Sequence, residues 1–479
     1  MGSVGLSFGS ATSGQGFDVT STVNQIVTNL QAVETPWKNQ LTALQDKDTA
    51  LSSLGTQLST LTTDLQNLTD FEGVLANKTG SSSDTNTLEL VSASSTAVAG
   101  THTVTVQNLA QTSSAASDAV GASDVLTGSV TFKVGNGQWQ TVDVGDSNTA
   151  ATLAGLAAVI NTAGLGVQAS VLTNADGTER LSLVSQTGGA AGQITIANST
   201  NDSQSPTTLA DSTTPDSSSG LGLATIQDGK DANFTVDGVA LSSGTNTVSS
   251  AIPGVTFQLL STGNGTASNP EAVEVVIAND TSSIASAIST FVNDYNTTIK
   301  AINAQEGNDS SGNPEPLDGT AVLAQLQEGL LSAVSATYGT GTINSLISLG
   351  ITASSSDDGT ITLDSSALTD ALNQNFSQVA SFFQDAGGFG STFAETLNEL
   401  GNNSGADGAL AMALNEDSSE ETTLNTDVSN QEALIATQKT NLTTELNQAN
   451  EILQSIPEQL QEVDEMYSAI TGYDNNQNG

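Results

Sequence analysis

Few residues in this chain could do chemistry, and they are widely spaced. His102 is the only histidine and there is no cysteine, so a thiol nucleophile and a zinc thiolate site are excluded. His102 falls in an alternating run typical of a strand, and we interpret it as a structural or solvated side chain. The 51 acidic residues leave a glycosidase-type carboxylate pair open on spacing alone. We nevertheless predict that the protein is not an enzyme and binds no cofactor.

One polar segment has part of a calcium-loop pattern. Asp309, Asn313 and Glu315 carry side-chain oxygens close together in the sequence. A calcium loop also needs the full ligand spacing and a glutamate at its twelfth position, and both are absent here. We therefore expect a solvated loop and no metal site.

Basic residues are scarce in this chain. It has 8 Lys plus Arg against 51 Asp plus Glu, a formal net charge of −43. Binding of nucleic acid or of an anionic membrane surface needs clustered cations, so neither partner is expected. No apolar run reaches the roughly 18 residues of a membrane span. Met1–Gly16 lacks the basic and apolar regions of a signal peptide, so any export would use another route.

The most regular pattern in the sequence predicts long helices at the two ends of the chain. From Val23 to Leu68 apolar residues recur three and four positions apart, with only Gln40 and Lys47 breaking the series. This heptad pattern predicts helices spanning about 70 Å. Pro36 should cause a kink or a break near the preceding residue, giving two rods. The polar core positions indicate one specific register, stabilised partly by assembly.

The C-terminal end has a matching pattern. Heptad spacing runs from Leu424 to Leu442 and, after a four-residue stutter, from Leu446 to Ile470. Pro457 predicts a second kink. Each segment must bury its apolar stripe, so we expect the ends to pair with each other or within a multimer, and two unrelated surface helices are the alternative. The stripes predict a homo-oligomer with its contacts mostly in the end segments.

The middle of the chain has the pattern of strands. Alternation in 87–91 and 101–106 flanks a Ser/Ala/Gly turn and predicts paired strands, and Gly135-Asn136-Gly137 predicts a hairpin. Residues 199–220 are typical of a linker. Further strands are expected at 167–171, 181–184, 193–197, 233–239, 255–260 and 271–278, with helices at 150–161, 284–302, 323–331 and 368–383. The order is therefore helix, β-rich middle, helix.

Several short motifs follow one another along the chain. They are Phe17–Val27, Glu34-Thr35-Pro36, Gly100–Ala110, Asp231–Val239, Ile252–Phe257, Phe291–Asn296, Leu349–Thr352 and Asp358–Asp364. In this order they resemble the family of flagellar filament cap proteins, also called hook-associated protein 2 or FliD. No single motif would suffice. The module around 153–184 also resembles a β repeat found in several hook and cap proteins.

The resemblance implies an α+β multidomain fold, in which N- and C-terminal coiled-coil or helical-bundle legs flank two inserted β-rich head domains. The terminal segments need not be ordered in the isolated protein. The expected divisions are 1–40 with 431–479 for the terminal coiled-coil segments, 41–75 with 284–430 for a helical leg domain, 76–118 with 224–283 for a β-rich head domain, and 119–223 for an outer α+β head domain.

The resemblance also implies a structural cap at the distal, extracellular end of the bacterial flagellar filament. Such a cap promotes insertion and folding of exported flagellin and prevents its loss. The implied partners are further copies of the chain in a ring of five or six subunits, flagellin, hook–filament junction proteins and an export chaperone. The residues expected at oligomer or flagellin contacts are Val23, Ile26, Leu30, Val33, Trp37, Leu453, Ile456, Leu460, Val463, Tyr467 and Ile470.

Two other functions fit parts of the sequence. A flagellin-like or hook–filament junction protein also has helical ends and a β-rich middle, although the motifs from Asp231 to Phe257 favour the cap. An acidic extracellular adhesin would usually carry a signal peptide or an anchor, and neither is visible. Trp37 fits a subunit contact and the core of its own helix equally well.

Overall fold

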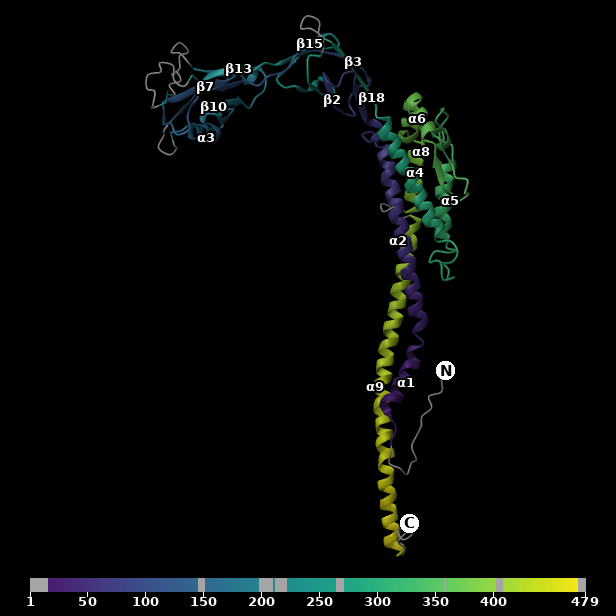
Figure 1. Cartoon of the computed structure of the whole chain (residues 1–479). Helices are drawn as coiled ribbons and strands as arrows, with labels where there is room; N and C mark the ends of the chain where they lie inside the picture. The colour runs from purple at the N-terminus through teal and green to yellow at the C-terminus, as the bar shows by residue number, and fades with distance from the viewer. Residues whose placement is uncertain are drawn as a thin grey trace. The chain divides into compact units, whose positions relative to one another are not determined.

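The structure is a computed structural model (Figure 1) that describes residues 16–144, 151–197, 210–211, 222–263, 271–356, 358–401 and 408–472. The chain divides into two compact units. One unit combines Met1–Thr69 with Ala285–Gly479 and is mostly helical, and the other, Asp70–Ile284, is mostly strands. The expected order of helix, β-rich middle and helix is confirmed.

The helical unit combines three long helices, α2, α4 and α9, with several shorter ones. Its elements are α1 (Val19–Gln31), α2 (Thr35–Thr69), α4 (Thr281–Asn303), α5 (Ala321–Ser335), the short 3-10 helix η4 (Leu346–Leu349), β19 (Ile351–Ala353), β20 (Ile361–Leu363), α6 (Ser365–Gln374), α7 (Phe376–Gln384), α8 (Phe389–Leu400) and α9 (Ala409–Thr471). Asp18 and Thr320 cap α1 and α5 by accepting a hydrogen bond from a backbone amide in the first turn.

Proline acts differently in the two end segments. The break expected near Thr35 is confirmed, because α1 ends at Gln31 and α2 begins at Thr35. Pro36 is the second residue of α2, where its missing N–H costs no helical hydrogen bond. Pro457, in contrast, lies inside α9, which continues through it to Thr471.

An aromatic cluster forms the centre of the helical unit. The ring of Phe389 is stacked at 5.1 Å from Phe393 and at 5.3 Å from Phe382, measured between ring centroids. Phe291 of α4 meets Phe389 edge to face at 5.9 Å. Such pairs add to the free energy gained by burying their area, so this cluster holds α4, α7 and α8 together.

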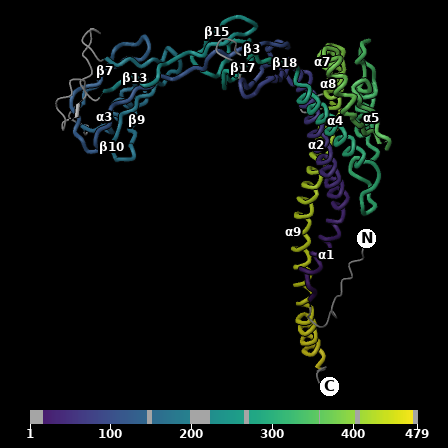
Figure 2. Tube along the Cα trace, turned by 45° about the horizontal axis from the view of Figure 1, so that its top comes forward, coloured from purple at the N-terminus to yellow at the C-terminus, as the bar shows by residue number. Residues whose placement is uncertain are grey.

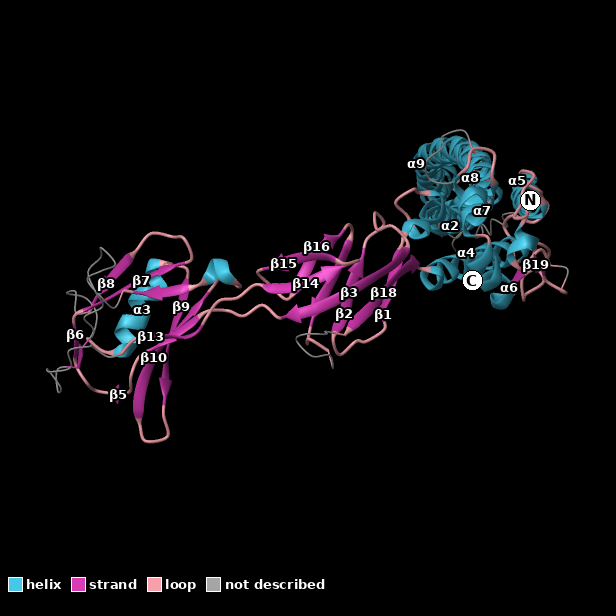
Figure 3. Ribbon diagram, turned by 90° about the horizontal axis from the view of Figure 1, so that it is seen from above, coloured by secondary structure: helices cyan, strands magenta, loops and turns pink. Residues whose placement is uncertain are grey.

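The β-rich unit contains two separate apolar cores, and Figure 3 shows the strands in two groups. The first core lies between the sheets β1-β18-β3-β14-β15 and β16-β17-β2. Their strands are β1 (Lys78–Ser82), β2 (Leu88–Ala93), β3 (Gly100–Asn108), β14 (Ala232–Val236), β15 (Val239–Ser243), β16 (Thr247–Ile252), β17 (Val255–Leu259) and β18 (Ala272–Asn279), after a 3-10 turn, η1 (Val74–Ala76).

The second core is covered by one helix, α3 (Leu153–Ala163), which packs against β9 and β10. Its strands are β4 (Ser114–Ala116), β5 (Val120–Gly121), β6 (Leu126–Thr127), β7 (Ser129–Val134), β8 (Gln140–Asp143), β9 (Val167–Thr173), β10 (Thr178–Ser185), β11 (Ile194–Ile196), β12 (Ala210–Asp211) and β13 (Ala224–Gln227), with a 3-10 turn, η2 (Ala190–Gly192). The hairpin predicted at Gly135 joins β7 to β8. A Cβ atom at Gly135 would lie 2.1 Å from the carbonyl oxygen of Ala191, and its φ is +54°, so only glycine fits.

Two expectations for the middle of the chain need correction. The strands at 87–91 and 101–106 are not paired, because β2 bonds to β17 while β3 bonds to β18 and β14. The chain crosses between two sheets at this point, and each strand buries its apolar face in the shared core. The expected linker 199–220 lies mostly outside the described residues, but Ala210–Asp211 within it is a strand paired with β6.

Two isoleucines of the helical unit give a matched test of this core. Ile288 of α4 is 0% exposed and Ile347 of η4 is 70% exposed. Ile288→Ala should lower the free energy of unfolding by about 3 kcal/mol through lost burial and a residual cavity. Ile347→Ala should change it by less than about 0.5 kcal/mol. Denaturant unfolding followed by far-UV circular dichroism measures both, and equal losses would contradict the described packing of α4.

Candidate functional site

The two ends of the chain pack against each other as antiparallel helices. Near the start of α1, the backbone N–H of Phe17 donates to Oδ1 of Asn450 at 2.8 Å. Further along, Nζ of Lys47 on α2 lies 2.8 Å from Oδ1 of Asp417 on α9. Residue numbers thus rise along α1 and α2 while they fall along α9, and Figures 1 and 2 show these helices side by side. The expected pairing of the two ends with each other is confirmed.

The contact between α1 and α9 has a thin apolar core. Ile435 of α9 is buried among valines of α1, and larger side chains close the edges. The buried members are Val19, Val23, Val27 and Ile435, and the half-buried ones are Phe17, Leu30, Leu442 and Leu446. A core of this size gives limited stability, so polar contacts next to it decide the register.

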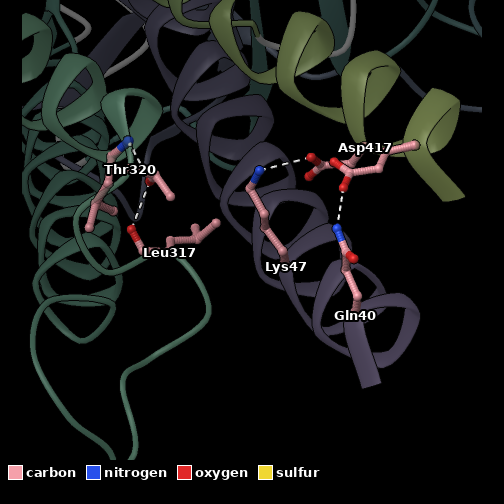
Figure 4. Close-up of polar contacts among 7 residues, drawn as sticks. Gln40, Lys47, Leu317, Thr320 and Asp417 are labelled. Carbon is pink, nitrogen blue, oxygen red and sulfur yellow. Dashed lines mark hydrogen bonds and ion pairs between the residues drawn. The ribbon is translucent and has the colours of Figure 1, made fainter. Parts of the chain in front are cut away.

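The two polar residues that interrupt the N-terminal heptads both bind acids of α9. Lys47 forms its ion pair with Asp417, whose side chain is only 2% exposed, and Gln40 donates a hydrogen bond to Glu420 (Figure 4). A shift of one helix against the other would leave Asp417 buried without a cation, which costs several kcal/mol. These contacts therefore select one register, as the polar core positions predicted.

The partners of Gln40 and Lys47 were missed in the sequence, because α9 begins earlier than expected. It starts at Ala409, well before Leu424. Leu410, Asp417 and Leu424 follow heptad spacing, and Asp417 breaks the apolar series as Lys47 does on the other side. The signal that could have revealed the contact is that a basic residue interrupts one apolar series and an acidic residue interrupts the other.

The structure separates the predicted contact residues into two groups. Near the chain's N-terminus, Val23 is buried, three others are half-buried and Val33 is exposed at the break between helices. The first group is Val23, Ile26, Leu30, Val33 and Trp37. On α9, exposure increases toward the C-terminus, from half-buried Leu453 and Ile456 to exposed Leu460, Val463, Tyr467 and Ile470.

The second group forms an apolar stripe on the last turns of α9, half-buried at Leu453 and Ile456 and exposed from Leu460 on. In the described residues, Phe17 contacts Asn450 and Gly16 lies against Asn450 and Gln454. Beyond Gln454, α9 continues to Thr471, which adds about 25 Å of helix. The exposed fraction rises from 47% at Leu460 to 83% at Ile470. We call Leu453, Ile456, Leu460, Val463, Tyr467 and Ile470 the distal stripe. Exposed apolar residues aligned on one helix face mark a surface that can bind a partner.

His102 serves the fold of the β-rich unit. Its Nδ1 lies 2.8 Å from Oδ2 of Asp237, and the N–H of Thr103 donates to the other oxygen of that carboxylate. Asp237 has a φ of +52° in the turn between β14 and β15, so the contact fastens a tight turn to β3. The hydrogen bond from His102, followed by that from Thr103, holds the pKa of Asp237 below its usual range.

The loop with the partial calcium pattern is closed by its own backbone. Oδ1 of Asp309 accepts hydrogen bonds from the amides of Asn313 and Ser311, both at 2.8 Å, and the bond from Asn313 contributes most to holding its pKa below the usual range. Across the described ranges, no group of three or more His, Cys, Asp or Glu side chains could hold a metal ion. No helix in the part of the chain that the structure describes is long and apolar enough to cross a membrane.

Comparison with known proteins identifies the family to which these paired ends belong. The family model for the N-terminus of flagellar hook-associated protein 2 matches residues 15–113, and the model for its C-terminus matches residues 229–469, half of the chain. The chain belongs to the flagellar hook-associated protein 2 family. Its resemblance to the cap family, drawn from short motifs, is thereby confirmed.

Individual family members match over long stretches. B-type flagellar hook-associated protein 2 of Pseudomonas aeruginosa is 30% identical over 325 residues, which cover 65% of this chain and 66%, just under two thirds, of that protein. Flagellar hook-associated protein 2 of Escherichia coli is 28% identical over 381 residues, 76% of this chain and 78% of that protein.

One solved family member has a similar fold. The crystal structure of the D1-D2-D3 domains of the flagellar cap protein FliD from Escherichia coli aligns with a TM-score of 0.56 at 24% identity. The alignment covers 77% of this chain and 99% of that one. At this identity the likeness concerns the fold, and it agrees with helical ends around a β-rich middle.

The ion pair between Lys47 and Asp417 can be tested by substitution. Lys47→Met should lower the free energy of unfolding by about 3 kcal/mol, because it leaves Asp417 buried without its cation. The double variant Lys47→Met/Asp417→Leu should recover most of this loss, since both polar partners are then gone.

Lys439 provides the control, because it is exposed on α9. Lys439→Met should change the free energy of unfolding by less than about 0.5 kcal/mol. Far-UV circular dichroism in denaturant reports all three variants. If Lys47→Met were as stable as the unchanged protein, the ion pair would have no role in joining α2 to α9.

Proposed function

We propose that this protein is a structural cap at the distal end of the bacterial flagellar filament, outside the cell. In this role it promotes insertion and folding of exported flagellin and prevents its loss. The observation that carries the proposal is the distal stripe, an apolar helix face that is exposed from Leu460 on, in a chain of the hook-associated protein 2 family. Both matching family models are of that protein, which supports the cap over a junction protein.

The distal stripe suits repeated, reversible contact with helices of flagellin. Burying a Val, Leu or Ile side chain contributes roughly 1.5–3 kcal/mol. The free-energy cost of ordering the two partners offsets much of this gain, so a stripe of six residues would bind a helix reversibly. Glu458, Glu462 and Glu465 are exposed on the same helix and restrict binding to the apolar face. Contacts of this kind can form and release as each flagellin subunit arrives, and no covalent chemistry is needed.

Self-association follows from the same surfaces. The formal net charge of −43 makes copies of the chain repel one another, so an oligomer must be held by specific apolar contacts. We place these contacts on the distal stripe, on exposed Val33 and on half-buried Trp37. The proposed assembly is a ring of five or six subunits, and each subunit is proposed to have the four domains expected from the sequence. Hook–filament junction proteins and an export chaperone are further proposed partners.

Charged residues on the distal stripe should abolish capping. Cells producing only Val463→Asp/Ile470→Asp protein should lack long filaments and release flagellin into the medium, because the buried contact would then require an unpaired charge. The control is Gln459→Asp/Gln461→Asp, which adds the same charge beside the stripe. Electron microscopy of cells and immunoblots of the medium measure both results. Normal filaments in the stripe variant would rule out this surface as the flagellin contact.

Oligomer formation should depend on salt as well as on the stripe. The purified full-length protein should sediment above its chain mass of 48.3 kDa, with a larger oligomer fraction at high salt because screening reduces repulsion between acidic copies. Val463→Asp/Ile470→Asp should shift it toward the monomer. Sedimentation velocity at low and high salt measures the fractions. If the oligomer fraction changed neither with salt nor with the stripe substitutions, the subunits would have to associate through a different interface.

A further inference from the structure

At two places α2 brings a carboxylate against acids of other helices. Asp48 lies beside Asp417 and Glu421 of α9, and Asp64 lies beside Asp294 of α4. Two carboxylates that share a site cannot both be ionised without a large repulsion. Repulsion between these carboxylates therefore opposes the packing of α2, and a bound proton or cation would reduce that repulsion.

The oxygens at these places have no hydrogen-bond donor. Among the described residues, Oδ1 of Asp48, Oδ2 of Asp417, Oε1 of Glu421 and Oδ2 of Asp64 are shielded from water and accept no hydrogen bond. Asp417 is 2% exposed, and Lys47 reaches only its Oδ1. A shielded oxygen without a donor is costly, so these oxygens are places where a bound proton would be stabilising.

The remaining charged groups near these sites are turned to solvent. On α9, Glu416 and Glu420 are exposed, and on α2 Asp46 is exposed. Glu395 and Glu399 of α8 and Lys300 of α4 are exposed as well, and α7 carries no titratable residue. Among the described residues, Lys47 is thus the cation that faces Asp48, Asp417 and Glu421, and its one charge does not balance three carboxylates.

A proton fits these sites better than a metal ion. Within the ranges that the structure covers, the acids are not gathered in a group of three or more that could hold a metal. A proton between two carboxyl groups needs only two oxygens, because it makes one group the donor and the other the acceptor.

We propose that the contacts of α2 with α9 and with α4 are controlled by protonation, and we call these two contacts the clasp. Uptake of a proton between Asp48 and Asp417 tightens α9 on α2, and uptake of a proton between Asp64 and Asp294 tightens α4 on α2. Release of both protons restores the repulsion and loosens these contacts. The clasp is a property of the helical unit and does not depend on the proposed capping function.

The direction of the pH dependence follows from the acids. Burial, followed by the charges of Asp417 and Glu421, raises the pKa of Asp48. Burial, followed by Asp294, raises the pKa of Asp64 from 3.8 to about 6. A carboxyl whose pKa is raised on folding stabilises the fold below its unfolded value and loses that effect as pH rises through the folded value. For Asp64 the window runs from 3.8 to about 6, so the contact of α4 with α2 is tighter in mild acid than at neutral pH. The raised pKa of Asp48 gives the contact of α9 with α2 a pH dependence of the same sign.

Thermal unfolding of the full-length protein tests the clasp. The unchanged protein should melt at a higher temperature in mild acid, near pH 5, than at pH 7.5. Asp48→Asn and Asp64→Asn should each raise the neutral melting temperature by about 3 °C and flatten the pH dependence. Each new amide can donate to the facing carboxylate at any pH.

Asp46→Asn is the matched control, because it removes the same charge from an exposed position on the same helix. It should follow the unchanged protein at both pH values. If it raised the melting temperature as much as the other two variants did, the effect would be general charge repulsion and the clasp would be wrong.

Hydrogen exchange at neutral pH supplies a local measurement. Asp48→Asn should slow amide exchange in the first part of α9, and Asp64→Asn should slow it in α4, each by several-fold. Tightening at one contact should not change exchange at the other. Unchanged exchange in both helices, or equal slowing across the whole chain, would overturn the proposal.

Discussion

The antiparallel contact of α2 with α9 is the constraint on which the helical unit depends. It joins segments that lie at opposite ends of the sequence, so it is a long-range contact that no local pattern places. The ion pair of Lys47 with Asp417, 2.8 Å long and largely shielded from water, holds this contact in one register. That register determines which part of α9 is covered by α1 and which part stays free.

The scarcity of cations shapes the rest of the fold. With 8 basic residues in the chain, many polar contacts use neutral groups. Asn161 joins α3 to β9 by donating to the carbonyl of Ala169 and accepting from its amide. Asn296 of α4 makes the same pair of bonds with Ile361 of β20. Such amide bridges satisfy buried backbone groups without any charge, which leaves the acidic residues free to dominate the surface.

The local features of the fold could be predicted from residue patterns. The heptads, the break before Pro36, the hairpin at Gly135 and the strands around Asp176 depend on residues that are close in sequence, and the structure has them. The start of α9 and the pairing of β2 were mistaken. In both cases a distant segment supplied the partner: α2 for the first turns of α9, and β17 for β2.

Sequence alone determined the periodicity of the ends, the β-rich middle, the acidic surface and, through its motifs, the family. Only the tertiary structure decided that Asp417 pairs with Lys47, that the residues just before α1 reach Asn450 and Gln454, and that α9 is exposed from Leu460 on. The physical reason is that an apolar stripe specifies the need for a partner but not its position. Register is set by a few polar contacts between residues far apart in the chain, and these exist only after the helices have packed.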